Sequence, residues 1–213
     1  MLGQRIEGTE KVLLDGKLVA FERASKHEHT HLAYYKPAGE LTSRKDPEGR
    51  RTVFDALPKP PHGRWISIGR MAVSTSGLLV LTTDGALAHR LMDKRSKVVQ
   101  EYAVRLLGTP VIGTLEGMVV GPGNRGSFDT IVPAGGDGAN TWLHVALHEP
   151  RHRDVRGSFE EVGLKVSRLI RIGYGPIELG KMRRGSYRKL DAAEAASLYA
   201  AAKLSTGARR YKD

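Results

Sequence analysis

The order of apolar segments between residues 101 and 172 constrains the fold of this chain more than any other feature of its sequence. Short alternating or continuous apolar runs predict strands, whereas apolar residues three or four positions apart predict helices. In chain order, we expect strand 101–107, a weak helix 110–117, strands 127–133 and 141–147, helix 150–163 and strand 166–172. This order, β-α-β-β-α-β, is the ferredoxin-like motif. The sequence therefore predicts an α/β (α+β) protein that contains a ferredoxin-like subdomain.

A polar loop bounded by Gly69 and Gly77 is a candidate functional site. It separates two apolar runs that read as strands and has no secondary-structure signal of its own. Glycine at both ends permits sharp turns or the close approach of a ligand. Arg70 adds a permanent, forked cation that suits phosphate or carboxylate. The residues alone leave two interpretations open, a structural connection between strands and a binding or catalytic loop.

The loop and its flanks, GRMAVSTSGLL followed by TTDG, resemble the signature of the ribosomal RNA pseudouridine synthases. In that family the motif runs Gly-Arg-Leu-Asp, two or so variable residues, Thr-Ser-Gly-Leu-Leu and a Thr-Asn-Gly or Thr-Asp-Gly turn. The position of the catalytic aspartate is occupied here by Ala72. A methyl group supplies neither a nucleophile nor a base. The resemblance further implies that the site includes Arg70, Thr75, Ser76 and Gly77.

Three further segments extend the resemblance. KPAGELTSRKDPEGRRTVFDALP, which starts at Lys36, is similar to the opening of the family's catalytic domain. Tyr102 matches the active-site tyrosine beside the target base, and Leu169 and Ile170 match the apolar residues that wall the uridine pocket. Without the resemblance, core packing is the preferred explanation for Tyr102 and an equal explanation for Leu169 and Ile170.

Arg156 matches the basic residue that pairs with the family's catalytic aspartate. The surrounding segment departs from the family pattern, since Pro150 replaces a glycine and Gly157-Ser158 replace Arg-Leu. The resemblance implies a mixed, mainly antiparallel sheet with flanking helices, and isomerisation of uridine in RNA without cofactor or metal. With Ala72 in place, we expect this chain to be inactive or severely impaired. The alternative is a noncatalytic RNA-binding or ribosome-assembly protein on the same fold.

The resemblance covers the chain from Leu32 to Glu194 and sets the expected domain organisation. Residues 1–25, which contain a hairpin turn at Asp15-Gly16, are interpreted as the remnant of an N-terminal S4-like RNA-binding module. Residues 26–213 form the catalytic-type domain, with its ferredoxin-like part at 101–172. Within this domain, Asp84 and Asp191 are placed to cap the helices that follow them.

Net charge points to a polyanionic partner. The chain carries 34 Lys and Arg against 23 Asp and Glu, a formal charge of +11. Between residues 151 and 190 there are eleven basic and four acidic residues, so the excess is concentrated there. Only 6% of residues are aromatic, which disfavours a platform that stacks many bases and favours contacts to the backbone of folded RNA. We therefore expect a structured RNA as the partner, bound in part by Arg183, Arg184 and Arg188, and the resemblance implies that this RNA is ribosomal RNA of the large subunit.

Other classes of protein are excluded by composition. The absence of cysteine excludes disulfides, thiol catalysis and a zinc site of the cysteine type. No apolar run approaches the roughly 18 to 20 residues of a membrane span, and the polar first ten residues are unlike a signal peptide. We expect a soluble, cytoplasmic monomer that does not bind a membrane.

Three histidines, His27, His29 and His31, would share one face of an extended segment. A metal site is one interpretation, but no carboxylate or cysteine ligand converges with them in the sequence. We therefore interpret the segment as an exposed linker and assign no metal.

Neutralising Arg183, Arg184 and Arg188 together should weaken binding to structured RNA. The affinity should also depend less steeply on salt concentration, because a protein that makes fewer phosphate contacts releases fewer counterions on binding. The measurement is the affinity for a folded ribosomal RNA fragment at several salt concentrations. An unchanged affinity and salt slope in the triple variant would show that the basic footprint lies elsewhere.

Overall fold

The computed structural model of the protein describes residues 28–44, 46–93, 96–120, 127–136, 138–148 and 155–204, and the backbone alone of 12–14, 17–19, 121 and 124–125. β1 and β2 pair antiparallel, as the predicted hairpin requires, although Asp15 and Gly16 lie outside the described residues. The elements are β1 (Val12–Leu14), β2 (Lys17–Val19), β3 (His31–Lys36), η1 (Val53–Ala56), β4 (Ile66–Ser67), β5 (Ser76–Thr82), α1 (Gly85–Met92), β6 (Gln100–Leu107), α2 (Ile112–Met118), β7 (Val120–Gly121), β8 (Asn124–Arg125), β9 (Thr130–Gly136), β10 (Asn140–Leu147), α3 (Val155–Glu160), β11 (Val166–Tyr174), β12 (Ile177–Glu178), β13 (Tyr187–Lys189) and α4 (Ala192–Ala201).

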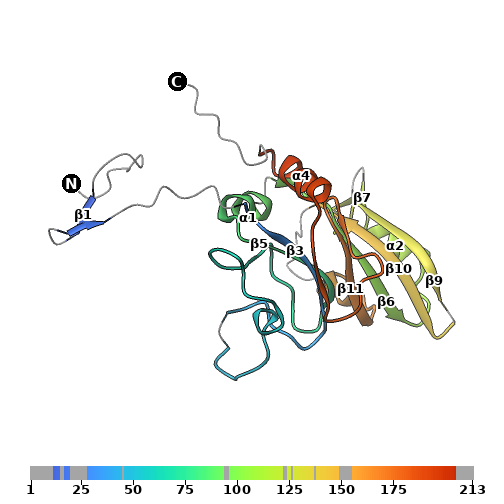
Figure 1. Ribbon diagram of the computed structural model, residues 1–213. Helices are drawn as coiled ribbons and strands as arrows, with labels where there is room; N and C mark the ends of the chain where they lie inside the picture. Colours follow the sequence, from blue (N-terminus) through green and yellow to red (C-terminus); the bar gives the residue numbers. More distant parts are fainter. Residues whose placement is uncertain are drawn as a thin grey trace.

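One nine-stranded sheet organises the molecule (Figure 1). Its order is β13-β3-β5-β11-β6-β10-β9, with β4 paired to β5 and β12 paired to β11. β5 and β11 run parallel, and the other pairs of described strands in this sheet are antiparallel. The prediction of a mixed, mainly antiparallel sheet with flanking helices is confirmed.

The predicted ferredoxin-like motif occupies one end of the sheet. Apart from the small β7-β8 hairpin that follows α2, the elements β6, α2, β9, β10, α3 and β11 are consecutive in the chain, and their strands lie in the order β11-β6-β10-β9. We call this part the ferredoxin-like half, and the part built from β3, β4, β5, β12, β13, α1 and α4 the core half. The division of the chain at residue 25 stays a prediction.

Two predicted boundaries in the ferredoxin-like half are wrong. The strand expected from residue 127 begins at Thr130. Phe128 instead hydrogen-bonds to the segment that follows α2, with its amide donating to the Met118 carbonyl and its carbonyl accepting from Val120. The Phe128 side chain is 1% exposed, so it fills the core beneath α2 before the sheet begins. Residues 150–154 of the predicted helix 150–163 lie outside the described residues; α3 covers Val155–Glu160, and residues 161–163 form a turn.

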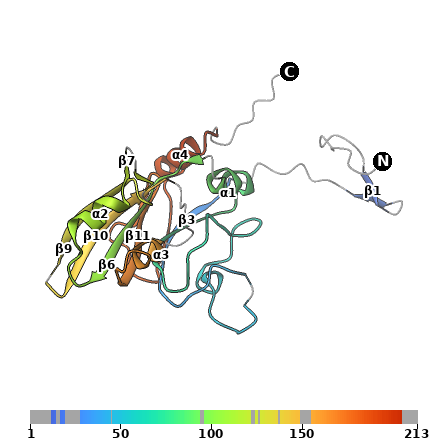
Figure 2. The same cartoon turned by 180° about the vertical axis from the view of Figure 1, so that it is seen from behind.

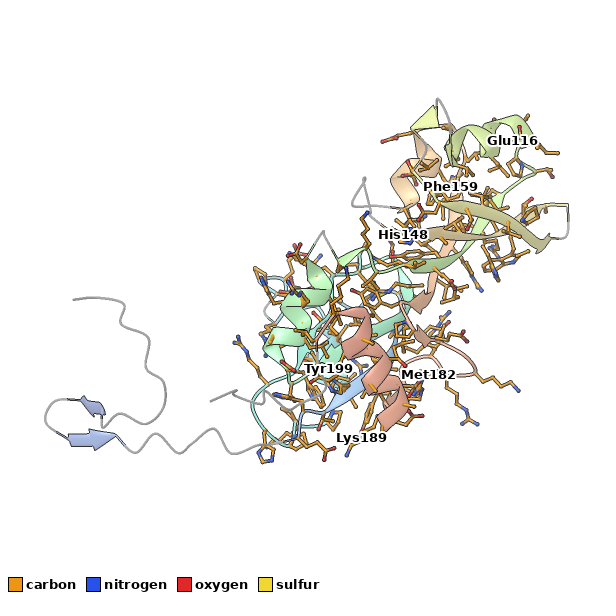
Figure 3. All side chains as sticks on the ribbon, turned by 90° about the horizontal axis from the view of Figure 1, so that it is seen from above. Glu116, His148, Phe159, Met182, Lys189 and Tyr199 are labelled. Carbon is orange, nitrogen blue, oxygen red and sulfur yellow. The ribbon has the colours of Figure 1, made fainter. Side chains whose placement is uncertain are left out.

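Helices cover opposite faces of the two halves. α1 and α4 pack on the core half, where Leu87 and Leu198 meet Leu78 of β5. α2 and α3 pack on the ferredoxin-like half, where Met118 and Phe159 meet the β6 and β10 side chains. The strand register places these two groups of sheet residues on opposite faces, because neighbouring side chains along a strand alternate. Figure 2 shows the helices from behind, and in Figure 3 Phe159 and Tyr199 mark the two halves.

Both predicted helix caps are present. Asp84 Oδ1 accepts hydrogen bonds from the amides of Ala86 at 2.8 Å and Leu87 at 3.1 Å. Asp84 Oδ2 also accepts a bond of 2.6 Å from the Tyr199 hydroxyl, so the cap of α1 holds α4 in place. At α4, Asp191 accepts from the Glu194 amide and the Glu194 carboxylate accepts from the Asp191 amide, which forms a capping box.

The exposed-linker interpretation is wrong for His31. This residue is the first of β3 and is only 6% exposed, because pairing with β5 places it beneath α4. Its Nδ1 lies 2.8 Å from Thr82 Oγ1, and its ring contacts that of Tyr199 edge-on at 5.5 Å. Burial lowers the pKa of His31. His29 is exposed, and His27 lies outside the described residues.

Gly77 permits the parallel contact between β5 and β11 that joins the two halves. Its φ is +109°, a conformation that side chains with a Cβ rarely adopt. A Cβ at this position would lie 2.2 Å from the Arg171 carbonyl oxygen and 2.5 Å from the Arg171 nitrogen. The two strands could approach this closely only with glycine at position 77.

Gly77→Ala should lower the free energy of unfolding by roughly 2 to 5 kcal/mol, because left-handed backbone strain adds to overpacking against β11. Gly63→Ala is the matched control, since Gly63 has φ +66° but nothing within 4 Å of an added Cβ. We expect the control to lose only about 1 to 2 kcal/mol. Urea denaturation of both variants gives the comparison, and equal losses would contradict the packing argument.

Candidate active site

The loop between β4 and β5 is a defined turn. The Thr75 amide donates to the Ala72 carbonyl at 3.0 Å, and the Gly39 amide donates to the Val73 carbonyl at 2.8 Å. Thr42 Oγ1 accepts from the Met71 amide and donates to the Met71 carbonyl. These bonds fix the backbone on both sides of position 72, where the Ala72 side chain is exposed.

The Lys36 side chain holds this turn in place through hydrogen bonds to its carbonyls. Its side chain is fully buried, and its Nζ donates to the carbonyls of Thr75 at 2.8 Å and Ala72 at 3.2 Å. Burial lowers the pKa of Lys36 to about 8, although the negative charge of Glu40 opposes the shift. Arg171 lowers the pKa further, which means that a second cation acts on Nζ.

Arg171 is that second cation, and it is 2% exposed. Its Nε donates to the Leu78 carbonyl of β5 at 2.7 Å, and its Nη1 donates to Gln100 Oε1 of β6 at 3.3 Å. Nη1 also lies 4.0 Å from the place where a Gly69 Cβ would be, so the guanidinium reaches the start of the loop. Nη2 is buried and has no hydrogen-bond partner within the described residues. An unsatisfied buried N–H of a charged group is costly, so this site favours an added acceptor.

Tyr102 belongs to the same group of contacts. It is 8% exposed, and its hydroxyl donates to Gln100 Oε1 at 3.0 Å. Gln100 therefore accepts from both Tyr102 and Arg171, which are paired across β6 and β11. The structure thus brings Tyr102 to the junction of the two halves, next to the strand that carries Arg171.

The other predicted site residues are distributed over this junction. Thr75 and Ser76 are buried, and Ser76 Oγ donates to the Leu169 carbonyl at 3.4 Å. Leu169 packs with Tyr102 in the ferredoxin-like half, whereas Ile170 packs on the opposite face beneath α1 and α4. Neighbouring strand residues point to opposite faces, so these two side chains do not share one wall.

Arg70 and Arg156 differ in their surroundings. Arg70 is exposed at the rim of the loop. Arg156 Nη1 donates to the Val166 carbonyl at the start of β11. The pairing of Arg156 with the residue at position 72 stays a prediction, and Arg171 is a second candidate for that role.

The predicted RNA-binding arginines lie on the core half. Arg183 and Arg184 are exposed, in a turn where the Ser186 hydroxyl donates to the Arg183 carbonyl at 2.6 Å. Arg188 instead forms two hydrogen bonds of 2.7 Å to the Glu194 carboxylate, and this pair lines a surface hollow of about 530 Å³ together with Lys181. Neutralising Arg188 would therefore also weaken the cap of α4.

Sequence reasoning missed Lys36, Gln100 and Arg171 as parts of the site. In the sequence, Lys36 only opens the KPAGELTSRKDPEGRRTVFDALP segment, and Arg171 is one of the eleven basic residues between 151 and 190. The available signal was position: a charged residue inside an apolar strand such as LIRIGY is buried only when it has partners.

The described part of the chain shows no metal-binding group, defined as three or more His, Cys, Asp or Glu side chains able to hold one ion. Within the same residues, no helix is long and apolar enough to cross a bilayer.

Comparison with known proteins decides the family. The sequence model described as RNA pseudouridylate synthase matches residues 30–161, which include the loop, Gln100 and Tyr102. The chain belongs to the RNA pseudouridylate synthase family. The expectation drawn from the signature motif is confirmed.

Relatives in this family are close in sequence. The chain is 48% identical over 196 residues to ribosomal large subunit pseudouridine synthase B of Yersinia pestis, covering 89% of this chain and 62% of the relative. It is 47% identical over 199 residues to the protein of that name from Salmonella typhimurium, covering 91% and 68%. The chain therefore spans about two thirds of the length of these pseudouridylate synthase relatives.

Solved structures support the same fold. A crystal structure of pseudouridylate synthase superposes with a TM-score of 0.68 at 24% identity, covering 92% of this chain and 83% of that one. The archaeal box H/ACA sRNP Nop10-Cbf5 complex gives 0.52 at 16% identity, covering 70% and 48%. At these identities, the likeness concerns the pseudouridylate synthase fold alone.

The buried Lys36 makes stability depend on pH. Its pKa of about 8 in the folded chain lies below its ordinary value of 10.5, so folding disfavours its charged form and stability rises as pH increases between these values. We expect the free energy of unfolding to rise by roughly 1 to 3 kcal/mol, relative to Lys36→Met, between about pH 7.5 and pH 10. Urea denaturation of the two proteins across this range isolates Lys36. A difference that stays constant or falls would contradict the assignment.

Proposed function

We propose that this chain is a pseudouridine synthase-type protein that binds structured ribosomal RNA of the large subunit in the cytoplasm as a monomer, and that Ala72 prevents it from isomerising uridine. The observation that carries the proposal is that two buried cations lie along the loop that holds Ala72: Lys36 donates to the Ala72 carbonyl, and Arg171 Nη1 lies 4.0 Å from the place of a Gly69 Cβ at the start of the loop. The names of the most similar relatives support the ribosomal substrate.

The charges around the turn suit a carboxylate at position 72. Such a group would lie in a turn anchored by the Lys36 ammonium, near a guanidinium that has an unsatisfied N–H. Charge-assisted hydrogen bonds would orient the carboxylate and keep it ionised, as nucleophilic or basic chemistry at the flipped uridine requires. Alanine leaves the cations and removes the reacting group.

Asp84 does not replace the missing carboxylate in this proposal. Its two oxygens accept bonds from the Ala86 and Leu87 amides and from the Tyr199 hydroxyl. These bonds and the charge of His29 lower the pKa of Asp84, although burial is the largest effect and opposes them. The carboxylate is thus committed to capping α1 and holding α4.

Ala72→Asp should restore appreciable isomerisation of uridine, whereas Ala72→Asn, of similar size but without charge, should not. The measurement is tritium release from ribosomal RNA labelled at carbon 5 of uridine. The unmodified chain should show no release. Turnover by the unmodified chain would overturn the proposal, because it would require a carboxylate elsewhere.

The Ala72→Asp chain also provides a test of which arginine, Arg171 or Arg156, pairs with the residue at position 72. In Ala72→Asp, replacing the true partner by glutamine should lower the restored activity and shift the remaining activity to higher pH, since the carboxylate loses its cation. Arg171→Gln and Arg156→Gln are compared in this assay, with thermal unfolding as the control for folding. We expect the larger loss with Arg171→Gln.

A noncatalytic RNA-binding or assembly role is the second candidate function, and Ala72 itself favours it. The two functions differ in the Ala72→Asp chain. Tight RNA binding without any activity in a folded Ala72→Asp variant would favour the assembly role, because the rest of the site would then also have lost its catalytic geometry.

A further inference from the structure

The ferredoxin-like half has one sheet face that no described helix covers. α2 and α3 pack on the face that carries Tyr102, Val104, Leu143 and Val145. α1 and α4 cover the other face only over the core half, and Figure 1 shows β6, β10 and β9 extending beyond them. The open face is thus on the side of the sheet opposite to the Tyr102 side chain.

The strand register gives the side chains that this open face displays. Arg105 of β6 is paired with Trp142 of β10 on one side and with Arg168 of β11 on the other. In the next row, His144 of β10 is paired with Val132 of β9. Because Val104 and Leu143 face the core beneath α2, their neighbours in sequence must face the open side. We call the set Arg105, Trp142, His144 and Arg168 the open-face cluster.

These side chains are accessible. Arg168 and His144 are exposed, Arg105 and Trp142 are half-buried, and the neighbouring Val132 is 54% exposed. Trp142 belongs to none of the three hydrophobic clusters of the described residues. A large aromatic side chain that does not serve the core is typical of an interaction surface.

The pairing of Arg105 with Arg168 destabilises the sheet. Like charges directly opposite each other on neighbouring strands are destabilising. Arg105 Nε donates to Ser167 Oγ at 2.8 Å, and Ser167 Oγ donates back to the Arg105 carbonyl at 3.0 Å, which holds the side chain in place. Neither Arg105 nor Arg168 has an ion-pair partner among the residues that the structure describes. The nearest acid on this face of β6, Glu101, is four residues away, about 14 Å along the strand.

We propose that the open-face cluster binds a single-stranded RNA segment of one or two unpaired nucleotides. An indole and an imidazole on adjacent positions of a strand face provide planes for base stacking, and the paired guanidinium groups beside them suit phosphate. The scarcity of aromatic residues in the chain limits the surface to few bases. This surface is separate from the candidate active site and does not depend on Ala72.

Intrinsic fluorescence provides a direct test, because the chain has only two tryptophans. Trp65 is 5% exposed and its Nε1 donates to the Pro58 carbonyl at 2.7 Å, so it is shielded in the core half. Titration with a single-stranded oligouridine 12-mer should quench the fluorescence of Trp142. Because Trp142→Leu removes the reporter itself, its affinity is measured by anisotropy of a fluorescein-labelled 12-mer; binding should weaken, and unchanged thermal unfolding would exclude misfolding.

The phosphate contacts are tested by Arg105→Gln/Arg168→Gln. This variant should bind the 12-mer roughly tenfold or more weakly, with a shallower salt dependence. The matched control is Arg90→Gln/Lys203→Gln, which removes two exposed charges from the core half and should leave the quenching unchanged. Equal loss in both double variants, or no quenching in the unmodified chain, would overturn the proposal. Binding of poly-glutamate in place of oligouridine, with the same arginine dependence, would assign the surface to an acidic protein and would also overturn it.

Discussion

The buried guanidinium of Arg171 joins the parts of this fold that carry the site. Strand β11 lies between β5 of the core half and β6 of the ferredoxin-like half, and Arg171 bonds to a residue of each. The parallel approach of β5 requires a residue without a Cβ at position 77. A charged side chain and a glycine therefore set the geometry of the junction together, and the turn at Ala72 lies immediately before it in the chain.

The junction buries two positive charges without a buried negative partner in hydrogen-bond contact among the described residues, an arrangement that protein cores ordinarily avoid. Lys36 and Arg171 are both buried beside the loop between β4 and β5, and burial of two like charges near each other is unfavourable. Neutral carbonyls and the Gln100 side chain satisfy most of their N–H groups. An anion would complete such an arrangement, which is the physical basis for the proposed site.

The sequence predicted the local features of the fold well. The ferredoxin-like order, the caps Asp84 and Asp191 and the family follow from periodicity, helix-start residues and motif. The sequence does not predict the pairings between distant segments, because strand periodicity indicates which face of a strand is buried but not which strand lies beside it. For the same reason the sequence predicts His31 in an exposed linker and does not single out Arg171, although β-pairing places both in the interior.

The order of the strands also bears on how the chain folds during synthesis. β3 at residues 31–36 lies between β5 and β13, and β13 is reached only at residues 187–189. The ferredoxin-like half is continuous from β6 to β11, so its local contacts can form while the end of the chain is still being made. The core half cannot be completed until then, because α4 supplies the Tyr199 hydroxyl that Asp84 binds. One edge of β3 must therefore remain unpaired through most of translation, which makes protection of that edge a condition for correct assembly.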